Sequence, residues 1–298
     1  MGVRVAVAAG GARETNVCPC QRVPENDAVP ENRALENRAR VCPLCDGMGM
    51  RLVNAKAAVR VAEPCECQHE RKVQLLLQRA AIPLRYADCS FENFHYERSD
   101  SAMARTVGVA RTFADIYPAS KEGVGLLFTG PIGTGKTHLA TAVLRKLVLE
   151  KGVRGLFYDY QELLKQITNS YSATAKTTES EVLRPVFQAE ILLLDELGGY
   201  RTTEWASDTV ANILNTRYNS RRVTIITTNF GVDAMGEAVR ETRSDIAGAA
   251  FGSAARAIRQ DTLADRIGER MQSRLKQMCV TVKMTGPDYR DRDRATLQ

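Results

Sequence analysis

Short apolar segments alternate with longer amphipathic ones from Ser99 to the end of the chain. Four segments are short and largely apolar, as expected of strands buried on both faces: Gly125–Phe128, Gly155–Asp159, Ile191–Leu194 and Thr224–Thr227. A weaker fifth candidate spans Val280–Val282. Helices that alternate with such strands are typical of a parallel sheet. The pattern therefore predicts an α/β fold with a parallel central sheet and helices on both faces.

The residues before this α/β region follow other patterns. Residues 1–40 are rich in Arg, Glu, Asn, Pro and Ala and lack apolar periodicity, which favours a disordered tail. A cysteine-containing module is expected over residues 41–70, and a helical linker over residues 71–98. The apolar spacing of His69–Ala81 predicts the helix at this junction. Residues 99–298 then form one large domain.

Two segments interrupt the rhythm of this domain, and a third continues it near the end. Thr168–Ser180 is polar and low in complexity, and we expect a mobile loop there. Ile246–Ala257 is rich in Ala and Gly, and the sequence leaves open whether it forms a small-residue helix or a flexible insertion. Thr262–Leu275 is predicted to be one helix, because apolar residues recur every four positions, at Leu263, Ile267, Met271 and Leu275.

Composition narrows the class of protein. The chain has 298 residues, of which 44% are hydrophobic and 26% charged, as in ordinary soluble globular proteins. It has no apolar run near the roughly 18 residues that span a bilayer, so no membrane partner is expected. Met1–Gly11 is a poor secretory signal, which favours a cytoplasmic location. The net charge of +6 permits nucleic-acid binding without demanding it.

The residues after the first apolar strand match the phosphate-binding pattern G-x-x-x-x-G-K-[ST]. Glycines in this pattern let backbone N–H groups turn toward phosphate oxygens, and the following helix adds positive potential. Lys136 can reach the β- and γ-phosphates, and the Thr137 hydroxyl can bind Mg²⁺. The alternative is a glycine-rich turn that only caps a helix. We predict an ATP site that extends to His138 and is built by Gly130, Pro131, Ile132, Gly133, Thr134, Gly135, Lys136 and Thr137.

Polar side chains follow two further apolar strands. The strand Ile191–Leu194 ends in Asp195 and Glu196. Asp195 would hold Mg²⁺ directly or through its water shell, and Glu196 would orient and deprotonate the attacking water. Asn229 follows the next strand, where its amide could bond the γ-phosphate or that water. These positions predict a catalytic group of Lys136, Glu196 and Asn229.

Arginines form a second stripe on the predicted C-terminal helix. Arg266, Arg270 and Arg274 recur every four residues. From the residues alone, the simplest interpretation is a solvated face paired with Asp265 and Glu269. The alternative is an arginine finger, a cation that reaches the γ-phosphate of a neighbouring subunit.

Six of the eight cysteines lie in the first 67 residues. In a reducing compartment, paired cysteines bind metal more often than they form disulfides. Cys18 and Cys20 lie in the tail without a suitable turn and are left out of the site, while Cys89 and Cys279 are expected to be buried apolar residues. Two pairs separated by 19 residues can close a tetrahedral zinc site, which would supply folding energy to this small module: Cys42, Cys45, Cys65 and Cys67.

The combination of GPIGTGKTHLA, ILLLDELGG, NTRYNS and TIITTNF resembles the DnaC/IstB branch of the AAA+ ATPases. That branch comprises bacterial replicative helicase loaders and transposition helper proteins. The resemblance covers roughly residues 80–298. Upstream, CPLCDGMG, CEC and IPLRYADCSFENF are similar to the zinc-bearing members related to DnaC and DnaI. The resemblance implies an AAA+ P-loop NTPase domain preceded by a small zinc-binding module.

The same resemblance implies roles for the C-terminal arginines. RIGERMQSRL is similar to the family's arginine-finger box, in which Arg274 is the best match and Arg270 the second. Asp288-Tyr289-Arg290 resembles the motif that carries the sensor-2 arginine, so Arg290 would contact nucleotide in its own subunit.

The implied function is that of an ATPase in DNA replication that uses hydrolysis as a switch. ATP-bound subunits would form a homo-oligomer, hold single-stranded DNA and load a hexameric replicative helicase. Residues flanking the polar loop are candidate DNA contacts, since binding without sequence preference needs cations and stacking groups: Lys165, Tyr171, Lys176 and Arg184. Two alternatives remain open, an IstB-like transposition helper ATPase and a nucleotide-gated DNA-binding module with negligible turnover.

Overall fold

A computed structural model describes residues 42–54, 60–97, 99–118, 123–172, 174–199, 203–232 and 261–289. The predicted tail and the Ala/Gly-rich segment lie outside these ranges. The chain divides into two units, Met1–Pro64 and Cys65–Gln298. In the first unit, β1 (Met50–Asn54) and β2 (Arg60–Pro64) pair antiparallel.

The second unit is built on a five-stranded sheet with the order β4-β5-β6-β3-β7. All neighbouring strands in this sheet are parallel. The five strands lie where the apolar pattern predicts them; one has the predicted bounds, and the others are longer by one residue at one or both ends: β3 (Gly125–Thr129), β4 (Gly155–Asp159), β5 (Ile191–Asp195), β6 (Val223–Thr228) and β7 (Cys279–Lys283). β3, the first strand of this sheet in chain order, lies between β6 and β7, so the carboxyl ends of β3, β5 and β6 meet at one edge.

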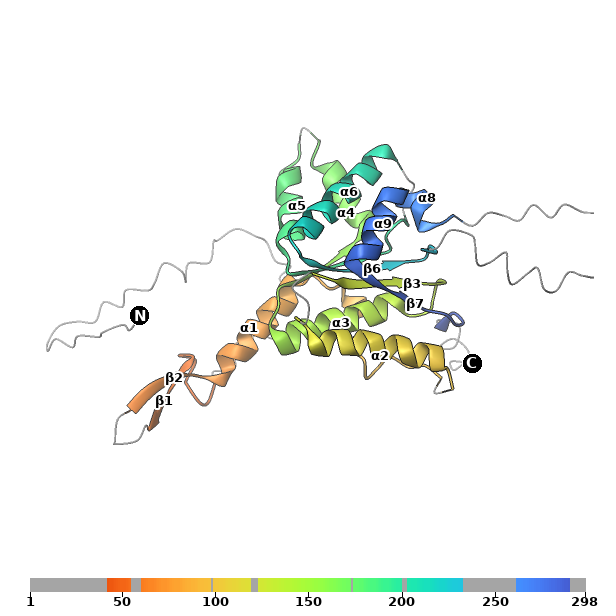
Figure 1. Cartoon of the computed structure of the whole chain (residues 1–298). Helices are drawn as coiled ribbons and strands as arrows, with labels where there is room; N and C mark the ends of the chain where they lie inside the picture. The colour runs from red at the N-terminus through yellow and green to blue at the C-terminus, as the bar shows by residue number, and fades with distance from the viewer. Residues whose placement is uncertain are drawn as a thin grey trace, which may run out of the picture. The chain divides into compact units, whose positions relative to one another are not determined.

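Helices cover both faces of this sheet, as predicted (Figure 1). One face packs against α1 (Glu66–Arg79), α2 (Ser101–Ile116) and α3 (Lys136–Lys151). The other face packs against α4 (Tyr160–Asn169), α5 (Glu179–Gln188), α6 (Glu204–Asn219), α8 (Leu263–Ile267) and α9 (Glu269–Met278). No helix in the described ranges is both long and apolar enough to cross a membrane.

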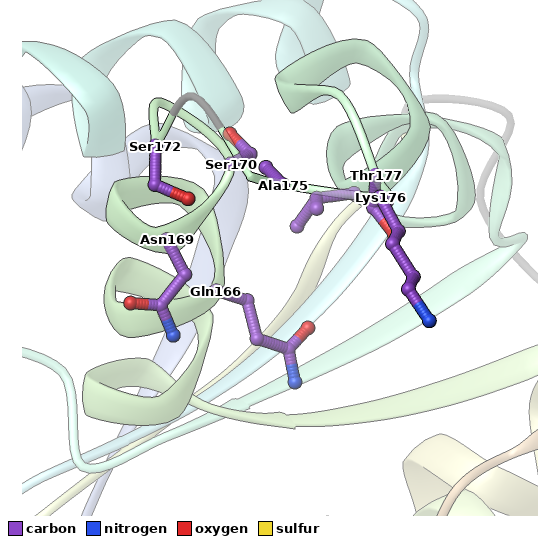
Figure 2. A pocket seen from close by; sticks show the side chains of 8 residues that line it. Gln166, Asn169, Ser170, Ser172, Ala175, Lys176 and Thr177 are labelled. Atoms are coloured by element: carbon purple, nitrogen blue, oxygen red, sulfur yellow. The ribbon is translucent and has the colours of Figure 1, made fainter.

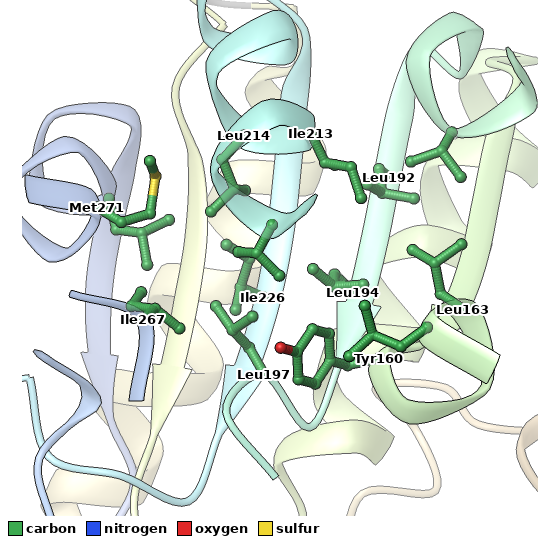
Figure 3. Close-up of a cluster of buried hydrophobic side chains, with 14 of the residues drawn as sticks. Tyr160, Leu163, Leu192, Leu194, Leu197, Ile213, Leu214, Ile226, Ile267 and Met271 are labelled. Carbon is green, nitrogen blue, oxygen red and sulfur yellow. The ribbon is translucent and has the colours of Figure 1, made fainter. Parts of the chain in front are cut away.

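Strand β5 shows why both faces are apolar. Successive side chains of a strand point to opposite faces, and here Leu192 and Leu194 join the cluster under α4, α6, α8 and α9 (Figure 3). Ile191 and Leu193 join the cluster under α1–α3. All four side chains are fully buried. The sheet therefore gives the strand ends a rigid base.

The C-terminal helix differs from the prediction of one continuous helix. Gly268 takes φ 84° and ψ 148°, which ends α8 and starts α9. Thr262 and Asp265 form a capping box at the start of α8. The residues of the apolar stripe are nevertheless all buried, because one residue outside the helix leaves their spacing nearly unchanged: Leu263, Ile267, Met271 and Leu275.

A buried arginine joins the sheet to two of its helices. Arg217 of α6 is fully buried. Its guanidinium donates to the carbonyls of Val186 and Ala189 at the end of α5, and also to Val223 O and Thr224 Oγ1 of β6. Burial lowers its pKa to about 9. Arg217, the arginine of the NTRYNS segment, thus donates to three backbone carbonyls and one hydroxyl group.

Candidate functional site

The predicted phosphate-binding loop connects β3 to α3. All three of its glycines, Gly130, Gly133 and Gly135, have both positive φ and no room for a side chain. A Cβ on Gly133 (φ 80°) would lie 2.0 Å from the carboxyl of Asp288, and one on Gly135 (φ 86°) would lie 2.6 Å from the Phe94 ring. The loop therefore needs glycine for its conformation and for its neighbours.

Lys136 is the first residue of α3, and only 7% of its surface is exposed. Its Nζ donates to Gly130 O at 2.9 Å and to Pro131 O at 2.5 Å. The ammonium group thus lies against the carbonyls of its own loop. Thr134 donates from Oγ1 to the same Pro131 carbonyl at 3.0 Å.

Asp195 lies at the end of β5 and receives two hydroxyl hydrogen bonds. Thr137 Oγ1 donates to its Oδ1 at 2.9 Å, and Thr227 Oγ1 donates to the same oxygen at 2.5 Å. Burial raises the pKa of Asp195 to about 6, although both hydroxyl groups act to lower it. The side chain is 4% exposed. The structure therefore holds a buried carboxylate next to the Thr137 hydroxyl.

Glu196 differs from Asp195 in being exposed. It has φ 57°, and its backbone N–H donates to Thr227 Oγ1 at 2.9 Å. Thr227 thus contacts both acids, although it was not among the residues predicted for the site. Its position in the TTN segment of β6, one strand over from β5, is the signal that could have identified it.

A cavity of about 220 Å³ lies at this edge of the sheet. Several predicted residues line it together: Gly133, Gly135, Lys136, Thr137, His138, Glu196 and Asn229. It is also lined by residues that the sequence analysis did not assign to the site, which are Arg85, Tyr86, Thr227 and Tyr289. The structure thus brings together the lysine, the exposed acid and the strand-end amide.

A second cavity of about 330 Å³ shares Gly135, His138 and Tyr289 with the first. The rest of its lining comes from one extended segment, Asn93–Glu97, which includes Phe94 and Tyr96. Aromatic rings and backbone groups therefore surround a space next to the phosphate-binding loop. Phe94 and Tyr96 fall in residues 71–98, which were predicted only as a helical linker.

His138 contacts that segment. Its Nε2 lies 3.1 Å from Ser90 O and 2.9 Å from Asn93 Oδ1, and its ring packs edge-on against Phe94 with centroids 5.3 Å apart. Burial lowers the pKa of His138, despite the hydrogen bond to Ser90. Burial therefore favours the neutral form of the ring.

The predicted arginine-finger residues lie away from the two cavities. Arg274 contacts the Asn215 side chain and lies 4.9 Å from the centroid of the Tyr218 ring. Arg270 is exposed, and Arg266 pairs with Asp261 at 2.8 Å. Arg290 lies outside the described residues.

The four predicted zinc ligands come together. The sulfur atoms of the two pairs all lie within 4.8 Å of one another. Cys45 and Cys65 are buried, and Cys45 Sγ accepts a hydrogen bond from Gly49 N at 3.2 Å. Gly47 and Gly49 both have positive φ, which allows the tight turn after the first pair. Cys18 and Cys20 lie outside the described residues, while Cys89 and Cys279 are buried as expected.

A polar cavity of about 390 Å³ lies beside the connection between α4 and α5. Figure 2 shows Gln166 and Asn169 of α4 on one side of it and Lys176 and Thr177 on the other. Three predicted DNA-contact cations, Lys165, Lys176 and Arg184, are exposed. Tyr171 is exposed too and packs edge-on against Trp205 with centroids 6.3 Å apart.

Comparison with known proteins adds a family context. The model of the family described as IstB-like ATP binding protein matches residues 57–245. The replicative helicase loader DnaC of Buchnera aphidicola subsp. Baizongia pistaciae is 28% identical over 158 residues, 53% of this chain and 62% of that protein. The replicative helicase loader DnaC of Escherichia coli strain K12 is 25% identical over 190 residues, 64% of this chain and 75% of that protein. The chain thus spans about 62% of the length of the Buchnera relative.

One solved structure supports the fold directly. The crystal structure of the DnaC helicase loader aligns with a TM-score of 0.53 and 28% identity, covering 68% of this chain and 100% of that one. Together with the parallel five-stranded sheet, this likeness confirms the predicted AAA+ P-loop fold.

Proposed function

Because the chain belongs to the family of IstB-like ATP-binding proteins, we propose that it is an ATPase that loads a replicative helicase onto DNA. The relatives named as replicative helicase loaders support the choice of helicase loading within that family. The main structural support is the cavity of about 220 Å³ at the carboxyl edge of the sheet. Residues that follow three separate strands line it together: Lys136, Thr137, Glu196 and Asn229.

The phosphates of ATP would bind at the glycine-rich loop. Backbone N–H groups of the loop and the start of α3 provide the positive potential that a triphosphate needs. Lys136 would exchange its contacts with the carbonyls of Gly130 and Pro131 for contacts with the β- and γ-phosphates. Only the flexible Lys136 side chain has to move for this exchange, so helix α3 can stay in place.

Thr137 and Asp195 fit a magnesium ion. A hydroxyl and a carboxylate 2.9 Å apart offer the hard oxygen ligands that Mg²⁺ prefers. Mg²⁺ held there would neutralise charge that develops on the phosphates. Thr227 orients the Asp195 carboxylate through its hydroxyl, so it would act as a positioning residue.

Glu196 would remove a proton from the attacking water, and Asn229 would orient that water or the γ-phosphate. Both side chains line the cavity and both are exposed, as groups that meet water and substrate must be. The backbone at Glu196, just after β5, is held by its positive φ and by the hydrogen bond from its N–H to Thr227 Oγ1.

The adenine base would occupy the second cavity. Phe94, Tyr96 and Tyr289 provide apolar ring surface there, and Gly135 and His138 join this cavity to the phosphate site. A single nucleotide that extends across both cavities accounts for their shared lining.

Arg274 would stabilise transition-state charge from a neighbouring subunit, and Arg290 would contact the nucleotide in its own subunit. These roles rest on the family motifs and require an ATP-dependent homo-oligomer. The contacts of Arg274 with Asn215 and Tyr218 would then be the arrangement of an isolated subunit.

Single-stranded DNA would contact the region around the α4–α5 connection. Exposed Lys176 and Arg184 provide cations, and the exposed Tyr171 ring provides a stacking group. The polar cavity next to Lys176 adds hydrogen-bonding groups at the same place (Figure 2).

Zinc would bind the four cysteines. Sulfur atoms around a tetrahedral zinc ion lie about 3.8 Å apart, given Zn–S bonds of about 2.3 Å. The separation of at most 4.8 Å between these four sulfurs is close to that arrangement. A metal would supply stabilisation that this small segment has few buried side chains to provide.

The experiment that tests helicase loading is a pull-down of the host's replicative helicase with the full-length protein, with ATP, with ADP and without nucleotide. We expect nucleotide-dependent capture that changes when Lys136→Ala is used. Equal absence of helicase under all three conditions would contradict the proposal.

The family model also favours a second candidate, an IstB-like transposition helper. Such a protein would bind duplex DNA and a transposase in place of a replicative helicase. Capture of a transposase but not of the helicase in the same experiment would select it.

A further inference from the structure

His138 lies directly after the two residues that would bind phosphate and magnesium, and its Nε2 bonds residues from a distant part of the chain. It contacts the segment Ser90–Asn93, which leads into the wall of the second cavity. His138 is separated in the sequence by 48 positions from Ser90 and by 45 positions from Asn93. The contact therefore joins two distant parts of the nucleotide site.

The hydrogen-bond network fixes the direction of this bond. The Asn93 side chain donates from Nδ2 to Asp88 O at 2.7 Å, and its Oδ1 accepts from Ser90 N at 2.8 Å. Its oxygen therefore faces His138. Because the second neighbour, Ser90 O, is also an acceptor, Nε2 of His138 must carry the proton and donate to both.

Ring packing completes the same contact. Phe94 follows Asn93 and lies edge-on to the His138 ring. The Phe94 ring also fills the space beside Gly135, the last glycine of the loop. The His138 hydrogen-bond donor and the His138–Phe94 ring contact thus hold residues 90–94 against the start of α3.

We propose that His138 is a positioning residue that holds the Asn93–Glu97 wall beside the phosphate-binding loop, so that the wall can receive the base of the nucleotide. This inference rests on the proposed ATP site and adds a role that differs from phosphate binding. His138 acts on the base through the wall, and it has no part in the chemistry of hydrolysis. Its loss is expected to weaken binding of the base while contacts with the phosphates remain.

Arg145 provides a matched control. Its NH1 donates to Cys89 O at 2.6 Å, so it joins the same segment to the same helix. It lies seven residues after His138, two helical turns away from the phosphate-binding loop. A general loss of attachment between the segment and α3 would affect both positions, whereas positioning of the base wall would depend on His138.

The test compares two competitors for a fluorescent ATP analogue on the full-length protein with Mg²⁺. ATP carries the base, and inorganic tripolyphosphate does not. For His138→Leu we expect ATP affinity to fall about tenfold, the equivalent of one lost hydrogen bond of ordinary strength, with tripolyphosphate affinity unchanged. His138→Gln, whose amide N–H can replace the Nε2 donor, should retain nearly normal ATP affinity, and Arg145→Met should behave like the parent protein.

Several results would overturn the proposal. An equal loss for ATP and tripolyphosphate would show that His138 supports the phosphate-binding loop. If His138→Gln bound ATP as weakly as His138→Leu, or if both variants kept the parent's ATP affinity, the Nε2 donor would have no positioning role. If His138→Leu fails to fold, His138→Phe keeps the ring and lacks the donor, and failure of both to fold would assign His138 a purely structural role. Failure of the parent protein to bind ATP at all would instead overturn the proposed function.

Discussion

The nucleotide site and the four-cysteine cluster are both built from short sequence motifs, but they differ in what supports them. The phosphate-binding loop follows a fully buried strand and precedes a helix with nine buried residues, so two apolar clusters surround its base. The segment with the first cysteine pair has two strands of five residues and exposes Leu44 and Met48, the latter to 75%.

The difference separates two sources of structural order. At the nucleotide site, the free energy of folding comes from apolar packing elsewhere, so loss of a ligand contact should remove function and leave the fold. At the cysteine cluster, the ligand itself would supply that free energy, so its loss should remove local structure.

Removal of zinc should give the largest effect, because structural zinc sites contribute on the order of 10 kcal/mol. We expect about one zinc ion per chain in freshly purified reduced protein. Strong chelation, or Cys45→Ser, should remove it and abolish protection from hydrogen exchange in residues 42–54 and 60–67. Protection of the parallel sheet should remain. Metal content is measured by elemental analysis and protection by mass spectrometry.

Cys89→Ala is the control, since Cys89 is buried but lies outside the cluster. It should retain zinc. Protein that contains no zinc before chelation would eliminate the cluster as a metal site and with it this half of the comparison.

Glu196→Gln should give the next largest effect. A glutamine side chain keeps the shape but cannot accept the proton of the attacking water, and loss of a general base lowers turnover by roughly 10²–10⁴-fold. ATP binding and the melting temperature should be unchanged. Single-turnover hydrolysis of radiolabelled ATP measures the rate, with Glu150→Gln on α3 as the control. Parent-like turnover of the variant would favour a nucleotide-gated binding module or another base.

Lys136→Ala should weaken ATP binding by about 100-fold, since a charge-assisted hydrogen bond contributes about 1.5–3 kcal/mol. The fold should persist, because the ammonium group donates to two carbonyls of its own loop and the apolar clusters under the sheet do not depend on it. Titration calorimetry and thermal melting check the two parts. Lys146→Ala is the matched control, as Lys146 is on the same helix and pairs with Asp115 and Glu150. Loss of the fold together with binding would break the proposed contrast between the two sites.

Asp195→Asn should stabilise the nucleotide-free protein. At the nucleotide site, loss of a functional group would then increase the free energy of unfolding, whereas at the cysteine cluster loss of a ligand would lower it. Burial raises the pKa of Asp195 from 3.8 to about 6, so the folded state binds this proton more tightly than the unfolded state. The stability associated with the protonated form is present below about pH 4 and is lost as the pH rises through 6. At pH 7 the ionised carboxylate would destabilise the fold by up to about 3 kcal/mol.

Urea unfolding of the parent and Asp195→Asn at pH 7 and pH 4 measures this effect. The variant should be more stable at pH 7, and the difference should shrink toward zero at pH 4. Equal stability of the parent and the variant at both pH values would mean that the hydroxyl groups of Thr137 and Thr227 offset the cost of burying the Asp195 carboxylate.

The parts of the site that sequence analysis predicted are those that are contiguous in the chain. The phosphate-binding loop and the Asp195–Glu196 pair follow apolar strands, and strand ends in a parallel sheet meet at one edge. Four cysteines in two short pairs were likewise sufficient to predict a common cluster, and the sulfur atoms do come together. The roles of Arg274 and Arg290 depend on a neighbouring subunit or on residues outside the described ranges, and they stay predictions.

The sequence alone determined the strands, the covering helices and the loop, because each depends on side-chain periodicity or on a motif of adjacent residues. Only the tertiary structure decided which distant residues meet. Thr227 reaches Asp195 across 32 positions, and His138 reaches Asn93 across 45. The break at Gly268 also required the structure, since the apolar spacing continues across it. These features depend on strand order and packing, which one-dimensional periodicity does not contain.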